Sequence, residues 1–156
     1  MAKHHTLRVI PHLMGNLQKH EYTAGMRCPL AKLDSGSYQL VIKLADKRRI
    51  KVGRLGSFVF PAGYYVYTGS AKRGLEARIA RHLRRDKKLR WHIDYLLQFA
   101  TVVEVNRYPN KVECELNKIL SRQGGKVIVE RFGSSDCMCE THLLYIGGSQ
   151  ANILHQ

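Results

Sequence analysis

The sequence predicts an α+β fold, because short runs of strand composition alternate with segments of helical period. The expected order of elements is β-β-β-α-α-β-α-β-β, without an internal repeat or a low-complexity tract. With 156 residues and 44% hydrophobic content, the chain is long enough for one sizeable core and too short for two ordinary domains. We therefore expect an N-terminal extension over residues 1–29 and a single domain over residues 30–156.

The first half of the expected domain is rich in strand-forming residues. Residues 37–44 and 49–52 have strand composition, and Asp46-Lys47 can turn the chain between them. Glycines and a proline punctuate residues 53–63, after which residues 64–68 form a short β-rich run. These patterns predict an antiparallel hairpin at the start of the domain and a third strand after a connector.

Three helices and three further strands are expected downstream. Residues 75–86 carry an apolar stripe of helical period, and residues 88–99 are apolar nearly all round, as in a buried helix. Residues 112–122 place their apolar side chains on one face and stop at Gly124-Gly125. The remaining strands are expected at residues 101–105, 126–129 and 142–146.

Positive charge dominates the chain and is concentrated in one stretch. The 26 Lys and Arg against 12 Asp and Glu give a formal net charge of +14, which is typical of proteins with a polyanionic partner. Residues 72–90 hold nine basic and two acidic residues, a difference of +7, whereas general background charge normally interleaves both signs. A solvated helix face is the alternative. We expect this stretch to bind DNA, or RNA, through Lys72, Arg73, Arg81, Arg84, Arg85, Lys87, Lys88 and Arg90.

The hydropathy of the chain predicts no membrane partner. No run approaches the roughly 18 apolar residues of a membrane span, and residues 1–15 lack the apolar core of a secretory signal. We therefore expect a cytoplasmic protein, and the sequence leaves its oligomeric state open.

One constellation of residues suits phosphodiester chemistry. Tyr67 and the turn after it precede a helix on which Arg78 and His82, four residues apart, share one half-buried face. A half-buried arginine offers a planar fork for a phosphate, and His or Tyr in a cationic environment can lose or share a proton near neutral pH. These residue types are useful for phosphodiester hydrolysis.

The same residues carry a resemblance to a known family. Gly36-Ser37-Tyr38, Tyr67-Thr68-Gly69-Ser70, Leu75-Glu76-Ala77-Arg78 and His82, in this order, resemble the GIY-YIG endonuclease superfamily. The stretches 52–56, 81–85, 91–97, 113–116 and 132–137 are similar to one branch of it, small stand-alone proteins of unknown function that are sometimes found joined to endonuclease III. The resemblance covers residues 30–146.

The resemblance implies a small three-stranded antiparallel sheet flanked by helices, with short strands added at the C-terminus. It implies that Tyr38 and Tyr67 point into a site where one phenol positions or deprotonates the attacking water. Arg78 would hold the scissile phosphate and His82 would assist proton transfer. A glutamate of a later helix would hold one Mg²⁺ or Mn²⁺, which would polarise the phosphoryl oxygen. The implied function is a metal-dependent DNA endonuclease that selects its substrate by structure.

The sequence departs from the superfamily pattern in the spacing of its tyrosines. Tyr38 and Tyr67 are separated by a longer stretch than is usual, so the hairpin must carry an insertion. The position of the glutamate is also open, because Glu113 and Glu115 flank the apolar helix face at similar angles. Both remain candidates for the metal, with Glu113 preferred.

Four further residues are assigned supporting parts. Gly69 and Ser70 belong to the turn after Tyr67. His92 lies on a helix that is wholly apolar around it, a position more typical of a core histidine with its hydrogen bonds satisfied. Asp94 could orient a neighbouring His or Arg, or balance local charge.

The C-terminal Cys-x-Cys-x-x-His segment offers soft and borderline ligands that suit zinc: Cys137, Cys139 and His142. These are only three ligands, and Cys28, Cys114 or His92 would have to complete the site. The sequence therefore favours reduced structural thiols over zinc. Without the resemblance, the basic stretch alone supports a different function, a non-catalytic nucleic-acid-binding module.

Overall fold

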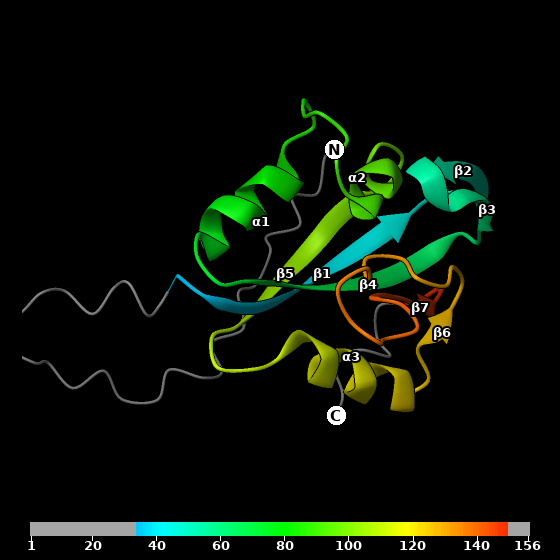
Figure 1. The fold of residues 1–156 in the computed structure, drawn as a ribbon. Helices are drawn as coiled ribbons and strands as arrows, with labels where there is room; N and C mark the ends of the chain where they lie inside the picture. Colours follow the sequence, from blue (N-terminus) through cyan, green and yellow to red (C-terminus); the bar gives the residue numbers. More distant parts are fainter. Residues whose placement is uncertain (1–33, 150–156) are drawn as a thin grey trace, which may run out of the picture.

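A five-stranded antiparallel sheet forms the centre of the protein, whose computed structural model describes residues 34–149 (Figure 1). The order of its strands is β5-β1-β4-β7-β6, so the two nine-residue strands β1 and β4 pair with each other at its middle. The strands are β1 (Gly36–Leu44), β4 (Gly63–Ala71), β5 (Thr101–Tyr108), β6 (Lys126–Val127) and β7 (Leu143–Gly147).

The predicted α+β class and the short C-terminal strands are confirmed, but the sheet has five strands instead of three. β5 extends the sheet beyond β1, and β7 pairs with the first half of β4 and carries β6 along its other side. The expected extension over residues 1–29 lies outside the described residues.

The predicted pairing of the first two strands is wrong. β1 pairs with β4 and β5, whereas β2 (Arg48–Val52) pairs with β3 (Gly56–Phe60), a strand that the sequence pattern missed. The short 3₁₀-helix η2 (Gly53–Leu55) joins β2 to β3. The physical reason lies in the side chains: β1 buries residues on both of its faces and belongs in a sheet interior, whereas β2 alternates buried and exposed residues after its first position. β2 and β3 therefore form a separate hairpin.

The two faces of the sheet carry separate hydrophobic clusters, as the alternation of side chains along a strand requires. Tyr38, Leu40 and Ile42 of β1 belong to the larger cluster, together with the apolar residues of the first two helices. Val41 points to the opposite face and packs in a smaller cluster with Leu120. Figure 1 shows the matching layers, with α1 and α2 on one side of the sheet and α3 on the other.

The helices are shorter than the sequence predicts. α1 (Leu75–Leu83) ends three residues before the predicted boundary, and α3 (Glu113–Arg122) starts one residue later than predicted. α2 (His92–Leu97) begins four residues late, because the carboxylate of Asp94 accepts the backbone N–H groups of Arg90 and Trp91 and fixes the start of the helix there. Within residues 34–149, no helix has the length and apolarity needed to cross a bilayer.

Candidate functional site

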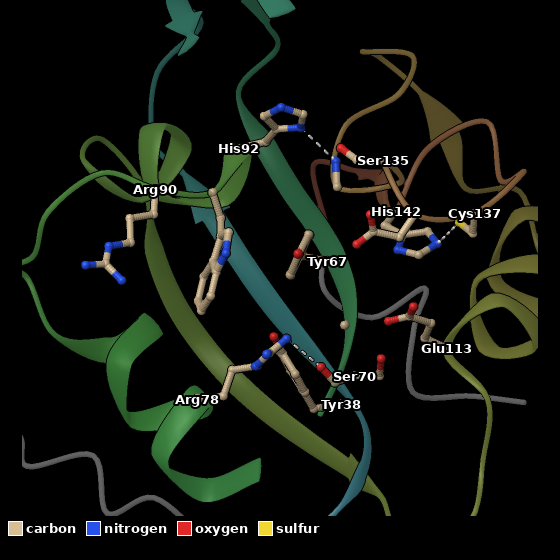
Figure 2. A pocket seen from close by; sticks show the side chains of 14 residues that line it. Tyr38, Tyr67, Ser70, Arg78, Arg90, His92, Glu113, Ser135, Cys137 and His142 are labelled. Carbon is tan, nitrogen blue, oxygen red and sulfur yellow. Dashed lines mark hydrogen bonds between the residues drawn. The ribbon is translucent and has the colours of Figure 1, made fainter. Parts of the chain in front are cut away.

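A pocket of about 240 Å³ opens beside the second half of β4 (Figure 2). β7 pairs with β4 only from Tyr64 to Tyr67 in the described sheet, so the chain diverges where the pocket begins. The residues that line it and were expected at the site are Tyr38, Tyr67, Gly69, Ser70, Arg78, Arg90, His92, Glu113, Cys137 and His142. Four lining residues belong to the stretches 91–97 and 132–137 that carry the resemblance, but were given no role in the site: Trp91, Gly133, Ser135 and Asp136.

A buried phenol–imidazole pair lies at the edge of the site: Tyr38 lines the pocket, whereas the predicted His82 is buried behind it and is not among the lining residues. Tyr38 is 1% exposed and its Oη lies 2.7 Å from Nε2 of His82, which is also buried. Burial, followed by the neighbouring Tyr67, raises the pKa of Tyr38 well above its ordinary value against the lowering effect of Arg78. The phenol therefore keeps its proton at neutral pH.

The imidazole of His82 is neutral at physiological pH. Burial is the largest cause that lowers its pKa, to about 4, and the charges of Lys87 and Arg81 act in the same direction against Asp94. Among the described residues, Nδ1 of His82 has no hydrogen-bond partner. The neutral ring can therefore accept a hydrogen bond at Nε2 or donate one, depending on its tautomer.

Tyr67 lies beside this pair, packed edge-on to the ring of His82 at a centroid distance of 6.0 Å. Burial raises the pKa of Tyr67, and the carboxylate of Glu113 raises it further. Two glycines make room for the phenols. A Cβ at Gly69 would lie 2.5 Å from Oη of Tyr38, and a Cβ at Gly133 would lie 2.8 Å from the ring of Tyr67. A larger residue at position 69, in the segment Tyr67-Thr68-Gly69-Ser70, would therefore clash with the phenol of Tyr38.

The guanidinium of Arg78 reaches the pocket from α1. Its Nη1 donates to the carbonyl oxygen of Ser70 at 2.7 Å, and its Cζ lies 5.1 Å from the centre of the Trp91 ring. These two contacts leave other donors of the guanidinium available, and Figure 2 shows Arg78 and Glu113 entering from opposite sides of Tyr67. The site therefore presents one cationic and one anionic wall.

Arg81, which was expected to bind nucleic acid, is instead paired with Asp94. It donates two hydrogen bonds to the fully buried carboxylate of Asp94, at 2.9 and 3.0 Å, and stacks 4.0 Å from the centre of the Trp91 ring. Burial by itself would raise the pKa of Asp94, but the hydrogen bonds from Arg81 and from two backbone amides outweigh it and lower the pKa. Asp94 is therefore ionised and ties α1 to α2.

The other predicted cations divide into two groups. Lys87 is half-buried and its Nζ donates to the carbonyl oxygens of His82 and Arg81, at 2.5 and 3.4 Å. Burial is the main cause that lowers its pKa. The remaining side chains are exposed and available to an anionic partner: Lys72, Arg73, Arg84, Arg85, Lys88 and Arg90.

The structure separates the two candidate glutamates. Glu113, the first residue of α3, is half-buried and lines the pocket. Glu115 is exposed and is not among the lining residues. Of the two glutamates, only Glu113 lines the pocket, and the exposed Asp136 lines it as well.

His92 lines the pocket and is half-buried, so the expectation of a core histidine is not met. Its Nδ1 accepts the backbone N–H of Gly133 at 3.0 Å, and burial lowers its pKa. In the neutral ring, this hydrogen bond leaves the proton on Nε2. His92 therefore has one N–H to offer to an acceptor.

Three cysteines and a histidine converge next to the pocket. The ligand atoms of Cys114, Cys137, Cys139 and His142 all lie within 4.8 Å of one another. Cys114 is the residue after Glu113 and supplies the fourth ligand that the Cys-x-Cys-x-x-His segment lacks. This set could bind a metal ion, because α3 packs its first turn against the loop and brings in the fourth ligand, Cys114. Burial raises the pKa of Cys114, so its thiolate needs a neighbouring cation.

The His82 ring makes folding stability depend on pH. Because its pKa is about 4 in the folded chain and 6.5 ordinarily, this contribution is complete above pH 6.5 and is lost as the pH falls towards 4. Lowering the pH from about 7 to about 5 is expected to cost about 2 kcal/mol through this ring. In His82→Gln, whose amide oxygen can still accept from Tyr38, the loss should be smaller by that amount. Urea unfolding at both pH values measures it; equal losses would contradict the assignment.

The comparisons with known proteins give one match. The model of a family described as "Domain of unknown function DUF123" matches residues 37–155, which include every residue of the pocket and of the Cys₃His cluster. Neither the curated proteins nor the solved structures include a match to the chain. The matched residues make up most of the 156-residue sequence, and the chain therefore belongs to the DUF123 family.

Proposed function

We propose that this protein is a metal-dependent DNA endonuclease of the GIY-YIG type that hydrolyses phosphodiester bonds in its pocket. The observation that carries the proposal is the hydrogen bond of 2.7 Å between the buried His82 and Tyr38, which lines the pocket together with Arg78 and Glu113. A phenol with a neutral proton acceptor, a guanidinium and a carboxylate are the groups that the reaction needs. Selection of the substrate by DNA structure belongs to the same proposal.

The phenol–imidazole pair activates the attacking water. In the tautomer with its proton on Nδ1, His82 accepts the hydrogen of Tyr38 at Nε2. As water attacks phosphorus, the phenol oxygen takes the water proton and passes its own proton to Nε2. This transfer requires a neutral His82, which its lowered pKa provides. Tyr67, which lies on β4, the strand paired with β1, orients the water.

Arg78 and Glu113 serve the phosphate. Arg78 is held by Ser70 and Trp91, so its free donors can bind the non-bridging oxygens without a large loss of side-chain entropy. Glu113 and Asp136 are oxygen donors, which fit Mg²⁺ or Mn²⁺, cations that keep several waters and use few carboxylates. Such an ion, when bound, polarises the phosphoryl oxygen. His92 also lines the pocket, and we propose that the N–H on its Nε2 donates to the leaving oxygen of the phosphate.

The Cys₃His cluster is proposed as a structural zinc site. In a tetrahedral zinc site, the usual bond lengths place two sulfurs roughly 3.8 Å apart and a sulfur and a nitrogen roughly 3.6 Å apart. Nε2 of His142 lies 3.3 Å from Sγ of Cys137 and 3.9 Å from Sγ of Cys114, on either side of that value. Zinc prefers these thiolate and imidazole ligands, whereas Mg²⁺ and Mn²⁺ prefer oxygen.

The proposed zinc would also hold the pocket together. Cys114 follows Glu113 directly, and Cys137 and His142 line the pocket themselves. A bound ion thus fixes the first turn of α3 to the loop before β7, and with it the carboxylate of Glu113.

A cleavage assay with matched variants tests the nuclease proposal. The parent is expected to cut some of a panel of linear, flapped and branched DNAs in the presence of Mg²⁺ or Mn²⁺. Tyr38→Phe and Arg78→Ala should each lower the rate by about 100-fold or more, because a proton-transfer group or a transition-state donor is lost.

The control variant is Arg122→Ala, which removes an exposed arginine at the end of α3, outside the residues expected to bind DNA, and should cut within a few-fold of the parent. The main alternative, a non-catalytic nucleic-acid-binding module, is favoured if the parent binds every DNA in a salt-dependent way and cuts none.

Metal analysis tests the zinc proposal. Protein purified without a chelator should contain about one zinc per chain, and Cys139→Ser should lose most of it, because three ligands hold zinc far more weakly than four. Met138→Ser changes the neighbouring residue, which is 98% exposed, and should keep the zinc of the parent. A parent without zinc, or equal zinc in both variants, would contradict the assignment.

A further inference from the structure

The β2–β3 hairpin is strongly basic in its own right. Residues 47–60 include five basic residues and no acidic one. All five side chains are exposed: Lys47, Arg48, Arg49, Lys51 and Arg54. This charge lies outside the stretch 72–90, in a separate sheet, and the site described above does not use it.

The outer face of the hairpin leaves its cations uncompensated. Ile50 and Val52 turn inwards and are buried, so Arg49 and Lys51 share the outer face, about 7 Å apart along the strand. Their cross-strand partners, Val59 and Ser57, carry no charge. In the part of the chain that the structure describes, no carboxylate forms an ion pair with either cation. Like charges repel each other, so this face favours a polyanion.

Helix α2 connects the hairpin to the pocket. His92, at its start, lines the pocket, and Tyr95, one turn later, packs against Gly53, where an added Cβ would lie 3.2 Å from the phenol oxygen. Figure 1 shows the hairpin beyond α2, on the side away from α1. The whole six-residue helix is about 9 Å long, the length of about three base-pair steps of B-DNA.

We infer that Arg49 and Lys51 of the hairpin bind backbone phosphates of the DNA duplex a few base pairs from the bond in the pocket. The inference rests on the proposed function only in taking DNA as the substrate. The duplex would then be held on both sides of α2, by the exposed cations of residues 72–90 on one side and by the hairpin on the other. Such phosphate contacts fix the register of the duplex without reading its sequence.

The salt dependence of DNA binding by the full chain tests this surface. Binding of a fluorescently labelled linear duplex is measured by anisotropy without divalent metal, so that no cleavage interferes. A plot of log affinity against log salt has a negative slope, and each phosphate contact that is lost should make this slope less steep by about one. The slope of the double variant Arg49→Gln/Lys51→Gln should therefore be less steep by about two, and the variant should bind DNA more weakly at moderate salt.

The matched control is Arg122→Gln/Lys126→Gln, which removes the same charges from exposed positions at the end of α3 and in β6. It should keep the slope of the parent, and thermal melting should show both variants folded. A hairpin variant with the slope of the control overturns the inference, even if the parent cuts DNA. A lower slope in the hairpin variant, without any cleavage by the parent, upholds the hairpin surface and overturns the nuclease proposal.

Discussion

The carboxylate of Asp94 is the interaction on which the candidate site depends. It is fully buried, and it accepts hydrogen bonds from Arg81 of α1 and from the backbone amides of Arg90 and Trp91 before α2. One ionised group thereby fixes where α2 starts and how α1 lies against it. Because a buried charge that loses its partner is strongly destabilising, the arrangement has no easy alternative. Arg78 on α1 and His92 on α2 are therefore held in fixed positions in the pocket.

The strands position the other half of the site. Tyr38 stands opposite Gly69 in the register of β1 and β4, and the missing side chain of Gly69 is what allows the phenol to reach His82. Burial keeps the phenol protonated and the imidazole neutral before the reaction, so the pair starts uncharged and can accept one proton at His82. Charge is left to the walls of the pocket, where Arg78 and Glu113 are accessible. An uncharged Tyr38–His82 pair beside the charged side chains of Arg78 and Glu113 suits the proposed phosphate chemistry.

Local patterns in the sequence were sufficient for the α+β class and for placing Tyr67 just before the helix that carries Arg78, whereas Tyr38 was expected at the site only from the family resemblance. They failed where a partner decides the outcome. Strand composition does not say which strands pair, so the sequence predicted a pairing of β1 with β2, whereas β2 pairs with β3. Arg81 has the sequence context of an exposed arginine, and only Asp94, thirteen residues away, distinguishes it. The fourth cluster ligand, Cys114, likewise comes from a helix packed on a distant loop. The helical angles of Glu113 and Glu115 did not show which of them enters the site, whereas in the structure only Glu113 lines the pocket.

If a phosphodiester bond is hydrolysed in the pocket, the two glutamates at the start of α3 should differ sharply in their effect on cleavage. The measurement is the single-turnover cleavage rate of Glu113→Gln and Glu115→Gln on the best substrate, at saturating Mg²⁺ or Mn²⁺. These variants carry the same chemical change two residues apart, one inside the pocket and one exposed outside it. We expect Glu113→Gln to lose nearly all cleavage and Glu115→Gln to cut like the parent. Equal rates in the two variants, or loss only in Glu115→Gln, would contradict this expectation.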